Sequence, residues 1–236
     1  MEKRLIVYTT DVHGKTTFIE KMLELSAKHK VKAIILNGDL TPDEYFMDIL
    51  AQRSFFELFL IPAFKKFKKK HDIEIFVLMG NHDYSVNMDV FYEAEKNKVF
   101  NVLHNEVHEF DGFEIVGYSF INPVGLWDWE KTEQEIKKDL DKLKKKLDFK
   151  RTIFVSHSPP YNTNLDMVFS KRHVGSKSIR EFIKENQPYL GLHGHIHESP
   201  QISGSMKDKI GKTLCVNPGN AQLVLIDLDT LEIKKI

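Results

Sequence analysis

The sequence predicts an α/β fold, because short strand-like runs alternate with helical segments and the final third is rich in β-type residues. The chain has 236 residues, of which 42% are hydrophobic and 29% charged, as in ordinary globular proteins. Five apolar runs have the length of buried strands, at residues 5–8, 33–36, 73–79, 152–156 and 189–192. No Pro/Gly/Ser-rich linker divides the chain, so we expect residues 1–236 to form a single domain.

The helices are predicted from apolar residues repeated at intervals of three and four. This pattern covers residues 16–29, 43–70 and 132–147. We expect the second of these helices to be interrupted at Pro62, because proline inside a helix removes a backbone hydrogen bond. Helices placed between strands indicate crossover connections in a parallel sheet.

The remaining β segments lie in the middle and at the end of the chain. Residues 106–118 contain an Asp-Gly turn between two strand-like halves, which is typical of a hairpin. Further β segments are expected at residues 213–216, 221–227 and 231–235. We interpret these segments as antiparallel additions that complete two sheets.

Clusters of Asp, Asn and His follow five of the predicted strands. They are Asp11 and His13, Asp39, Asn81 and His82, His157, and His195 and His197. Because loops at the carboxyl ends of strands in an α/β sheet converge on one crevice, we expect these side chains to meet in one site. Oxygen and nitrogen donors without a thiolate suit Mn²⁺, Fe or Zn²⁺.

The clusters differ in how strongly each indicates a metal. Taken alone, Asp11 is better explained as the cap of the following helix, Asp39 as a turn residue, and His157 is ambiguous. The run from His193 to His197 favours metal ligation, since three imidazoles in five residues need a metal or carboxylates beside them. Together the clusters predict a pair of cations. Such a pair polarises a phosphoryl oxygen and lowers the pKa of a bridging water, so the expected reaction is hydrolysis by a bridging hydroxide.

The order of these motifs, D-x-H, G-D, G-N-H-D, H and G-H-x-H across residues 11–197, resembles the calcineurin-like metallophosphoesterase superfamily. Residues 156–161, 173–176 and 194–199 are similar to its Icc-related prokaryotic branch. The resemblance implies a four-layer αββα sandwich of two facing mixed sheets, with metals at the strand ends. It also implies two divalent metal ions, of which Mn²⁺ is the first expectation and Fe or Zn²⁺ the alternatives.

The resemblance assigns a role to each motif residue. It implies that Asp11, His13 and His197 hold the first metal, that Asn81, His157 and His195 hold the second, and that Asp39 bridges them. His82 would bind no metal but would stabilise the phosphoryl group or protonate the leaving oxygen. His173 is a candidate contact for the substrate phosphate, and a capping role near Ser176 is an equal alternative.

One departure from the family pattern concerns the partner of His82. The family places an acid three residues after the bridging Asp, but here that position is Pro42 and the acid is Asp43. Either Asp43 or Asp83 is therefore expected to orient His82 as a catalytic partner. The phosphate-binding Arg associated with Ser/Thr protein phosphatases is also missing, which favours a small phosphodiester over a phosphoprotein.

Composition bounds the remaining possibilities. Lys and Arg together number 34, as do Asp and Glu, so there is no strong nucleic-acid signal. No apolar stretch is long enough for a signal peptide or membrane span, so we expect a cytoplasmic protein. Cys215, the single cysteine, is expected to be a buried thiol. The alternatives to a phosphodiesterase are a phosphomonoesterase, a nuclease or a non-catalytic metal-binding scaffold, and the oligomeric state stays open.

Overall fold

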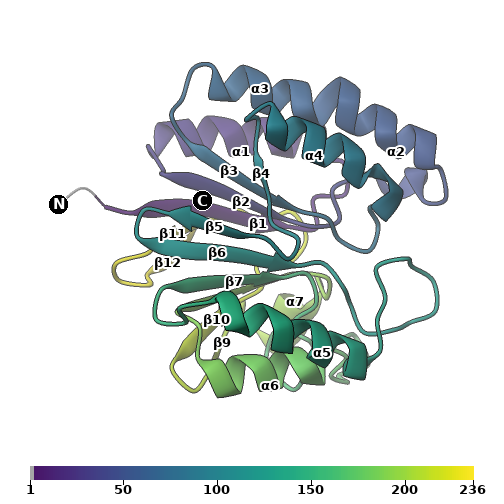
Figure 1. The fold of residues 1–236 in the computed structure, drawn as a ribbon, viewed down its shortest axis with the longest axis vertical. Helices are drawn as coiled ribbons and strands as arrows, with labels where there is room; N and C mark the ends of the chain where they lie inside the picture. Colours follow the sequence, from purple (N-terminus) through teal and green to yellow (C-terminus); the bar gives the residue numbers. More distant parts are fainter. Residues whose placement is uncertain (1–2) are drawn as a thin grey trace.

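Two six-stranded mixed sheets pack face to face, and helices cover the outer face of each (Figure 1). The computed structural model describes residues 3–236. The first sheet has the order β12-β11-β1-β2-β3-β4. Its strands are β1 (Leu5–Thr10), β2 (Ala33–Asn37), β3 (Glu74–Leu78), β4 (Asn101–Val102), β11 (Val224–Asp227) and β12 (Ile233–Lys235). Strands β1 to β4 are parallel, and β11 and β12 run antiparallel at the edge.

The second sheet has the order β5-β6-β7-β8-β10-β9. Its strands are β5 (Val107–Phe110), β6 (Phe113–Tyr118), β7 (Thr152–Ser156), β8 (Leu190–His193), β9 (Lys207–Ile210) and β10 (Thr213–Val216). The predicted hairpin forms β5 and β6. The expectation that residues 213–216 add an antiparallel strand is wrong on one side, because β10 pairs parallel with β8 and antiparallel only with β9.

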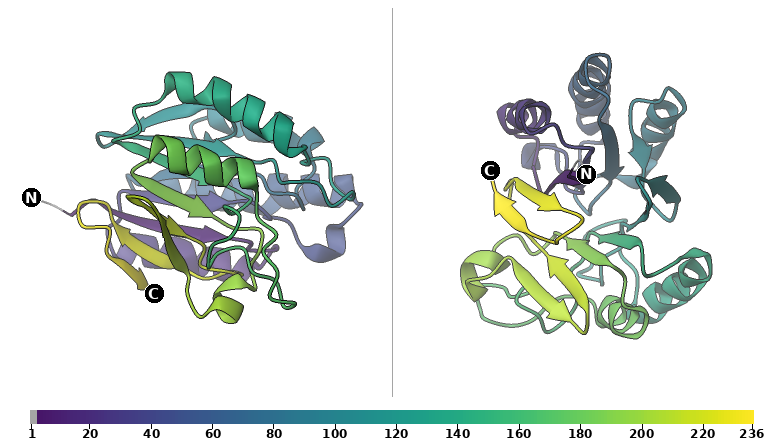
Figure 2. Two further views of the ribbon diagram at one scale, coloured as in Figure 1. Left: turned by 90° about the horizontal axis from the view of Figure 1, so that it is seen from below. Right: turned by 90° about the vertical axis from the view of Figure 1, so that its left-hand side faces the viewer.

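The helices form the two outer layers, as the end-on view in Figure 2 shows. The first sheet is covered by α1 (Thr16–Lys28), α2 (Ile49–Phe55), α3 (Ile61–Lys68) and α4 (Met88–Lys96). The second is covered by α5 (Glu133–Leu143) and α6 (Lys177–Asn186), and a short α7 (Ser199–Ser203) follows β8. The four-layer αββα sandwich is therefore confirmed.

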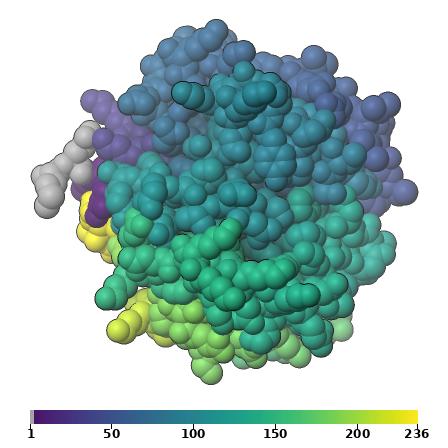
Figure 3. All heavy atoms as spheres, in the orientation of Figure 1, coloured from purple at the N-terminus to yellow at the C-terminus, as the bar shows by residue number. Residues whose placement is uncertain are grey.

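Burial on both faces explains why the strands read as continuous apolar runs. Alternate residues of β1 and β2 face opposite sides: Val7 and Ile34 pack under the first helix layer, whereas Ile6 and Ile35 pack between the sheets. A third cluster lies between the second sheet and its helices and includes the buried Cys215. In the space-filling view, the first and second halves of the chain meet over a continuous surface (Figure 3).

The long helical segment predicted at residues 43–70 is subdivided differently from the prediction. A 3₁₀ turn (Asp43–Tyr45) comes first, and α2 is joined to α3 by a π-helical segment (Phe56–Leu60). Pro62 lies in the first turn of α3 and does not interrupt a helix there. Pro62 has no N–H to donate, and the π turn directly before it, in which Ile61 N–H donates to Phe56 O, shifts the hydrogen-bond pattern at this point.

Three helices, α4, α6 and α7, were not predicted. Other short turns are 3₁₀ segments at Ser85–Asn87 and Lys144–Lys146. Within residues 3–236, no helix combines the length and apolar character needed to cross a membrane.

Candidate metal centre

All seven predicted metal ligands follow the carboxyl ends of parallel strands. Asp11 and His13 follow β1, Asp39 follows β2, Asn81 follows β3, His157 follows β7, and His195 and His197 follow β8. The three loops of the first sheet and the two of the second open at the same end of the sandwich. Backbone hydrogen bonds join the loops, including Asp11 N–H to Gly38 O (3.2 Å) and Gly194 N–H to His157 O (3.0 Å).

The backbone of this site is strained at four of the seven residues. Asp11, His13, Asp39 and His195 have φ angles of 51°, 44°, 49° and 64°. Residues other than glycine rarely adopt this left-handed backbone conformation, which costs roughly 1–2 kcal/mol per residue. Strain of this kind is concentrated at functional sites, where the surrounding structure holds it in place.

Asp39 lies at the centre of the group and faces it with both oxygens. Its Oδ1 is 3.2 Å from His157 Nε2, and its Oδ2 is 4.0 Å from His13 Nε2. Two sets of ligand atoms close enough to hold one cation share this residue: one is Asp11, His13 and Asp39, and the other is Asp39, His157 and His195. A carboxylate shared in this way has the geometry of a bridge between two cations.

The second set is largely buried and gathers around His157. His157 Nε2 lies 2.9 Å from Asn81 Oδ1, which adds the Asn predicted for this half of the site. Burial lowers the pKa of His157, but the charge of Asp39 and its hydrogen bond outweigh burial and raise the pKa to about 9. Desolvation lowers the pKa of His195 to about 3, so this imidazole is neutral and has a free lone pair at neutral pH.

The first set lies nearer the surface. Asp11 is fully buried, and burial raises its pKa. Its two oxygens each accept from the backbone N–H of His195 at 3.1 Å. The ring of His197 packs edge-on against His13 with 5.6 Å between centroids, and His197 is exposed at the mouth of the site.

These residues fit a pair of divalent cations. Asp11 and Asp39 are buried carboxylates, and within residues 3–236 the ion pairs of Asp39 are with His13 and His157 and not with Lys or Arg. Among the residues described, Nε2 of His13 and Nδ1 of His157 lack a hydrogen bond, whereas Nδ1 of His13 faces Asp43 Oδ1 at 2.7 Å. Buried charges and unpaired imidazole nitrogens are costly unless a cation satisfies them.

Two glycines are required by the close approach of these side chains. A Cβ on Gly38 would lie 2.4 Å from His157 Nδ1, and Gly38 has a φ of 71°. A Cβ on Gly194 would lie 1.9 Å from Thr10 Oγ1 and 2.8 Å from Asp11 Oδ2. The G-D and G-H-x-H motifs therefore carry a packing requirement as well as their polar residues.

The two candidate partners of His82 lie in different surroundings. Asp43 Oδ1 is 3.5 Å from His82 Nδ1 and 2.7 Å from His13 Nδ1. Asp83 instead accepts from the backbone N–H groups of Leu40 (2.9 Å), Thr41 (3.0 Å) and Gly80 (2.9 Å). The sequence offered two acids as partners of His82. Asp43 lies beside the His82 ring, whereas Asp83 joins the loops after β2 and β3 through hydrogen bonds to their backbone.

The backbone of His82 is held on both sides, which the sequence did not indicate. Its N–H donates to Asp39 Oδ1 at 2.9 Å, and its carbonyl accepts from Gln52 Nε2 at 2.7 Å. Gln52 is buried on α2 and also accepts from the N–H of Tyr84. Burial lowers the pKa of His82, and the charges of Asp39 and Asp43 oppose this shift.

Two further histidines have structural partners. His193, the first of the triple run, is buried at the end of β8 with Nδ1 2.8 Å from Ser156 Oγ, and burial lowers its pKa to about 3. His173 lies in the loop before α6, where its Nδ1 is 2.7 Å from the buried carboxylate of Asp166. That carboxylate also accepts from the backbone of the same loop, as at Gly175. The observed contacts of His173 are thus with its own loop, and a role in phosphate binding stays a prediction.

A model of the calcineurin-like phosphoesterase domain matches residues 5–199, nearly the whole chain. The chain belongs to the calcineurin-like phosphoesterase family. Members of this family are metal-dependent phosphoesterases, so the chain is a hydrolase of that class with candidate ligands for the family's dimetal centre. A curated relative, the uncharacterized protein MJ1162 of Methanocaldococcus jannaschii, is 30% identical over 229 residues and covers 94% of this chain and 91% of its own length.

Solved structures of calcineurin-like phosphoesterases share the fold at low identity. The crystal structure of TT1561 from Thermus thermophilus aligns with a TM-score of 0.74 at 19% identity, covering 100% of this chain and 99% of its own. A dimetal phosphatase from Danio rerio aligns with a TM-score of 0.63 at 9% identity over 100% and 99%. An archaeal phosphodiesterase aligns with a TM-score of 0.53 at 15% identity over 98% of both chains.

Proposed function

We propose that this calcineurin-like phosphoesterase holds two divalent cations and hydrolyses a small phosphodiester. The observation that carries the proposal is the position of Asp39, whose two oxygens face two different sets of candidate ligands. The first cation is assigned to Asp11, His13 and His197, the second to Asn81, His157 and His195, and Asp39 is shared. Because the donors are oxygen and nitrogen, Mn²⁺ is the preferred ion and Fe or Zn²⁺ the alternatives.

The cations, when bound, polarise a phosphoryl oxygen and make a nucleophile available at neutral pH. The chain's own residues position the other reacting groups. His82 is assigned to the phosphoryl or leaving oxygen, because its ring lies 5.0 Å from that of His13 and its backbone is fixed by Asp39. Asp43 is assigned as the positioning residue that faces His82 Nδ1.

A small diester is favoured over a phosphoprotein by the loop after Asp39. Residues 40–52 contain no Arg or Lys, so this loop supplies no cation for a second phosphate contact. The structures with the same fold include both a phosphodiesterase and a phosphatase, and fold alone does not choose between them.

Metal content tests the dimetal assignment without relying on activity. Wild-type protein reconstituted with Mn²⁺ and desalted should retain about two equivalents by elemental analysis. Asp39→Asn should lose at least one equivalent, because the neutral amide cannot bridge two cations. His71→Ala is a matched control, since His71 lies just before β3, at the opposite end of the strands. Uptake of one equivalent or fewer by the wild type would instead favour a scaffold.

Turnover tests the reaction. Mn²⁺-loaded protein should cleave bis(p-nitrophenyl) phosphate faster than p-nitrophenyl phosphate. His82→Ala should lose about 10²–10⁴-fold in kcat while keeping its metal, as expected for a group that acts in proton transfer or charge stabilisation. Unchanged turnover in this variant would remove His82 from the mechanism. Faster cleavage of DNA or RNA, with binding that weakens steeply in salt, would favour a nuclease.

A further inference from the structure

An aromatic pair lies directly beside His82. The ring of Trp127 lies over that of His82 with 4.4 Å between centroids and 32° between planes. Phe46 meets Trp127 at 4.7 Å and 60°, and lies 6.4 Å from His82. The two rings come from loops far apart in sequence, one before α2 and one between β6 and α5, and the latter loop projects beyond the ends of the strands (Figure 1).

The Trp127 loop is held by hydrogen bonds of two carboxylates. The carboxylate of Glu130 accepts from the backbone N–H groups of Gly125 (2.8 Å), Leu126 (3.0 Å) and Trp127 (3.1 Å). Asp128 accepts from Ser85 Oγ at 2.6 Å, which ties the loop to the segment after His82. Trp127 therefore lies in a loop that is already held by hydrogen bonds. Little conformational entropy of this loop is lost when Trp127 binds a ligand.

Next to the aromatic pair in sequence are two exposed aliphatic side chains, Met47 after Phe46 and Leu126 before Trp127. Phe46 is 39% exposed, Met47 77% and Leu126 68%. We define the apolar wall as Phe46, Met47, Leu126 and Trp127. Large apolar side chains that gather at one place on a surface mark ligand or partner sites more often than isolated ones do. This wall adjoins the proposed catalytic His82.

The charges around the apolar wall indicate what kind of group it accepts. Residues 41–52 and 122–130 contain no Lys or Arg, whereas Asp43, Glu44 and Asp48 lie in the first segment. An additional phosphate would be repelled there, which disfavours a nucleic acid or a polyphosphorylated nucleotide. A flat uncharged ring, in contrast, can stack on Trp127 or meet Phe46 edge-on.

We propose that the apolar wall binds an uncharged aromatic alcohol group of the phosphodiester substrate. The proposal rests on the proposed function, which places the phosphate beside His82, and it names the substrate class. Trp127 and Phe46 are specificity-determining residues that contact this group. Their rings select the aromatic group by stacking. The carboxylates of Asp43, Glu44 and Asp48 exclude polyanionic esters.

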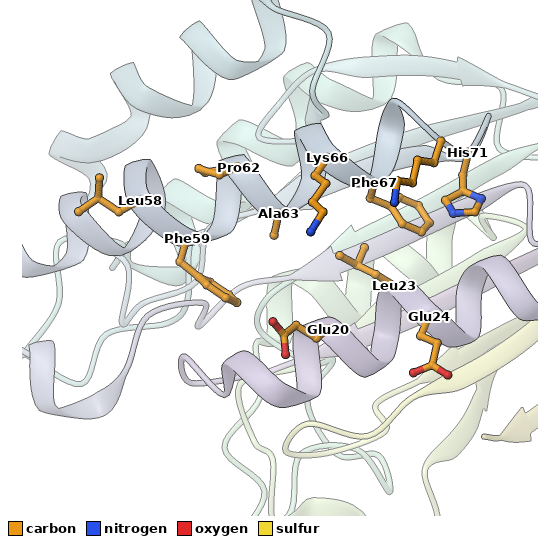
Figure 4. A pocket seen from close by; sticks show the side chains of 11 residues that line it. Glu20, Leu23, Glu24, Leu58, Phe59, Pro62, Ala63, Lys66, Phe67 and His71 are labelled. Carbon is orange, nitrogen blue, oxygen red and sulfur yellow. The ribbon is translucent and has the colours of Figure 1, made fainter.

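Two diesters with the same leaving group test the proposal. Mn²⁺-loaded protein is assayed with p-nitrophenyl benzyl phosphate and p-nitrophenyl methyl phosphate, and the wild-type ratio of kcat/KM should be about 10 in favour of benzyl. Trp127→Ala and Phe46→Ala should each reduce this ratio towards 1, and Trp127→Phe should keep most of it. Leu58→Ala is the control and should keep the wild-type ratio, because exposed Leu58 lines a separate groove between α1 and α3 (Figure 4).

Binding of two non-hydrolysable phosphonates separates this proposal from the proposed function. Calorimetry should show benzylphosphonate binding about ten-fold more tightly than methylphosphonate, with the difference lost in Trp127→Ala. If neither diester is cleaved but this difference is present, the apolar wall is confirmed and the proposed function fails. If both diesters are cleaved with a ratio near 1 and the two phosphonates bind with equal affinity, the apolar wall is refuted and the proposed function stands.

A second copy of the chain is the other occupant to exclude. Sedimentation of wild type and Phe46→Ala measures whether the apolar wall is covered in solution. A wild-type dimer that dissociates in Phe46→Ala would overturn the proposal, because the wall would then be a subunit interface. A monomer in both, with the ratio of kcat/KM changed as above, would support it.

Discussion

Replacing Asp83 tests whether the site depends on one buried carboxylate. Asp83 is fully buried, and its oxygens accept from the backbone N–H groups of Leu40, Thr41 and Gly80 and from Thr41 Oγ1 at 3.0 Å. These donors belong to the loops that carry Asp39 and Asn81. Asp83→Ala would leave the three backbone N–H groups without this acceptor.

The expected cost follows from the number of donors. A buried N–H left without a partner costs about 1–3 kcal/mol, so three give roughly 3–9 kcal/mol before relaxation and water entry reduce the sum. We expect Asp83→Ala to lose about 3–5 kcal/mol of unfolding free energy, a large share of the ~5–15 kcal/mol typical of a domain. Asp83→Asn should lose about 1–3 kcal/mol, because it keeps one acceptor oxygen and removes a charge whose burial raises the pKa of Asp83 to about 6.

Thermal and denaturant unfolding of the metal-free protein measure these losses. For a chain of this size 1 kcal/mol corresponds to roughly 2–4 °C, so Asp83→Ala should lower Tm by about 6–20 °C. Glu44→Gln, an exposed acid nearby, is the control and should stay within about 0.5 kcal/mol. If Asp83→Ala keeps the wild-type Tm but loses turnover, Asp83 acts by orienting His82. The claim that Asp83 stabilises the loops carrying Asp39 and Asn81 would then be refuted.

Three further outcomes are expected. Gly38→Ala should destabilise the fold by about 2 kcal/mol or more, since its Cβ would meet His157 at 2.4 Å in left-handed backbone, and equilibrium denaturation measures this. Burial, reinforced by Lys131, lowers the pKa of His104 to about 4. Its folded pKa is below the unfolded value of about 6.5, so stability falls as pH drops through this range, by about 1–2 kcal/mol between pH 7 and 5. His104→Gln should remove this loss of unfolding free energy between pH 7 and 5. A variant whose stability falls with pH as in the wild type would contradict the assignment to His104. If residues 1–236 are one domain, calorimetry should show one two-state transition, and two separable transitions would contradict this.

The position of the site was predictable because it depends on features that are local in sequence. Strands such as β2 and β7 are short apolar runs, and the polar residue that follows each run marks its carboxyl end. In parallel strands these ends lie at the same edge, so Asp39 and His157 could be placed together before any distance was known. Two groups of candidate ligands share Asp39 in the structure, and the division of all seven ligands between two cations, which the resemblance implied, stays a prediction.

Which acid lies beside His82 was not predictable, because it depends on the path of a loop. Pro42 occupies the position where the family has its acid, and a 3₁₀ turn after it carries Asp43 to within 3.5 Å of His82. Spacing alone also gave no reason to assign Asp83 to the backbone of Leu40 and Thr41. Three helices were missed for a different reason: the polar faces of α4 and α6 dilute a short apolar pattern that packing then completes, and α7 has only five residues.

The proposed ligands also bind the loops that hold them. Asp11 accepts from the backbone of His195, and Asp39 accepts from the backbone of His82, so each carboxylate joins two strand ends through one side chain. These bonds help to keep the left-handed backbone at Asp11 and Asp39, which would otherwise relax. A substitution at either carboxylate therefore disturbs a second loop as well as a cation. For this reason metal content and stability must be measured together, since loss of metal in Asp39→Asn shows a lost ligand only if the variant remains folded.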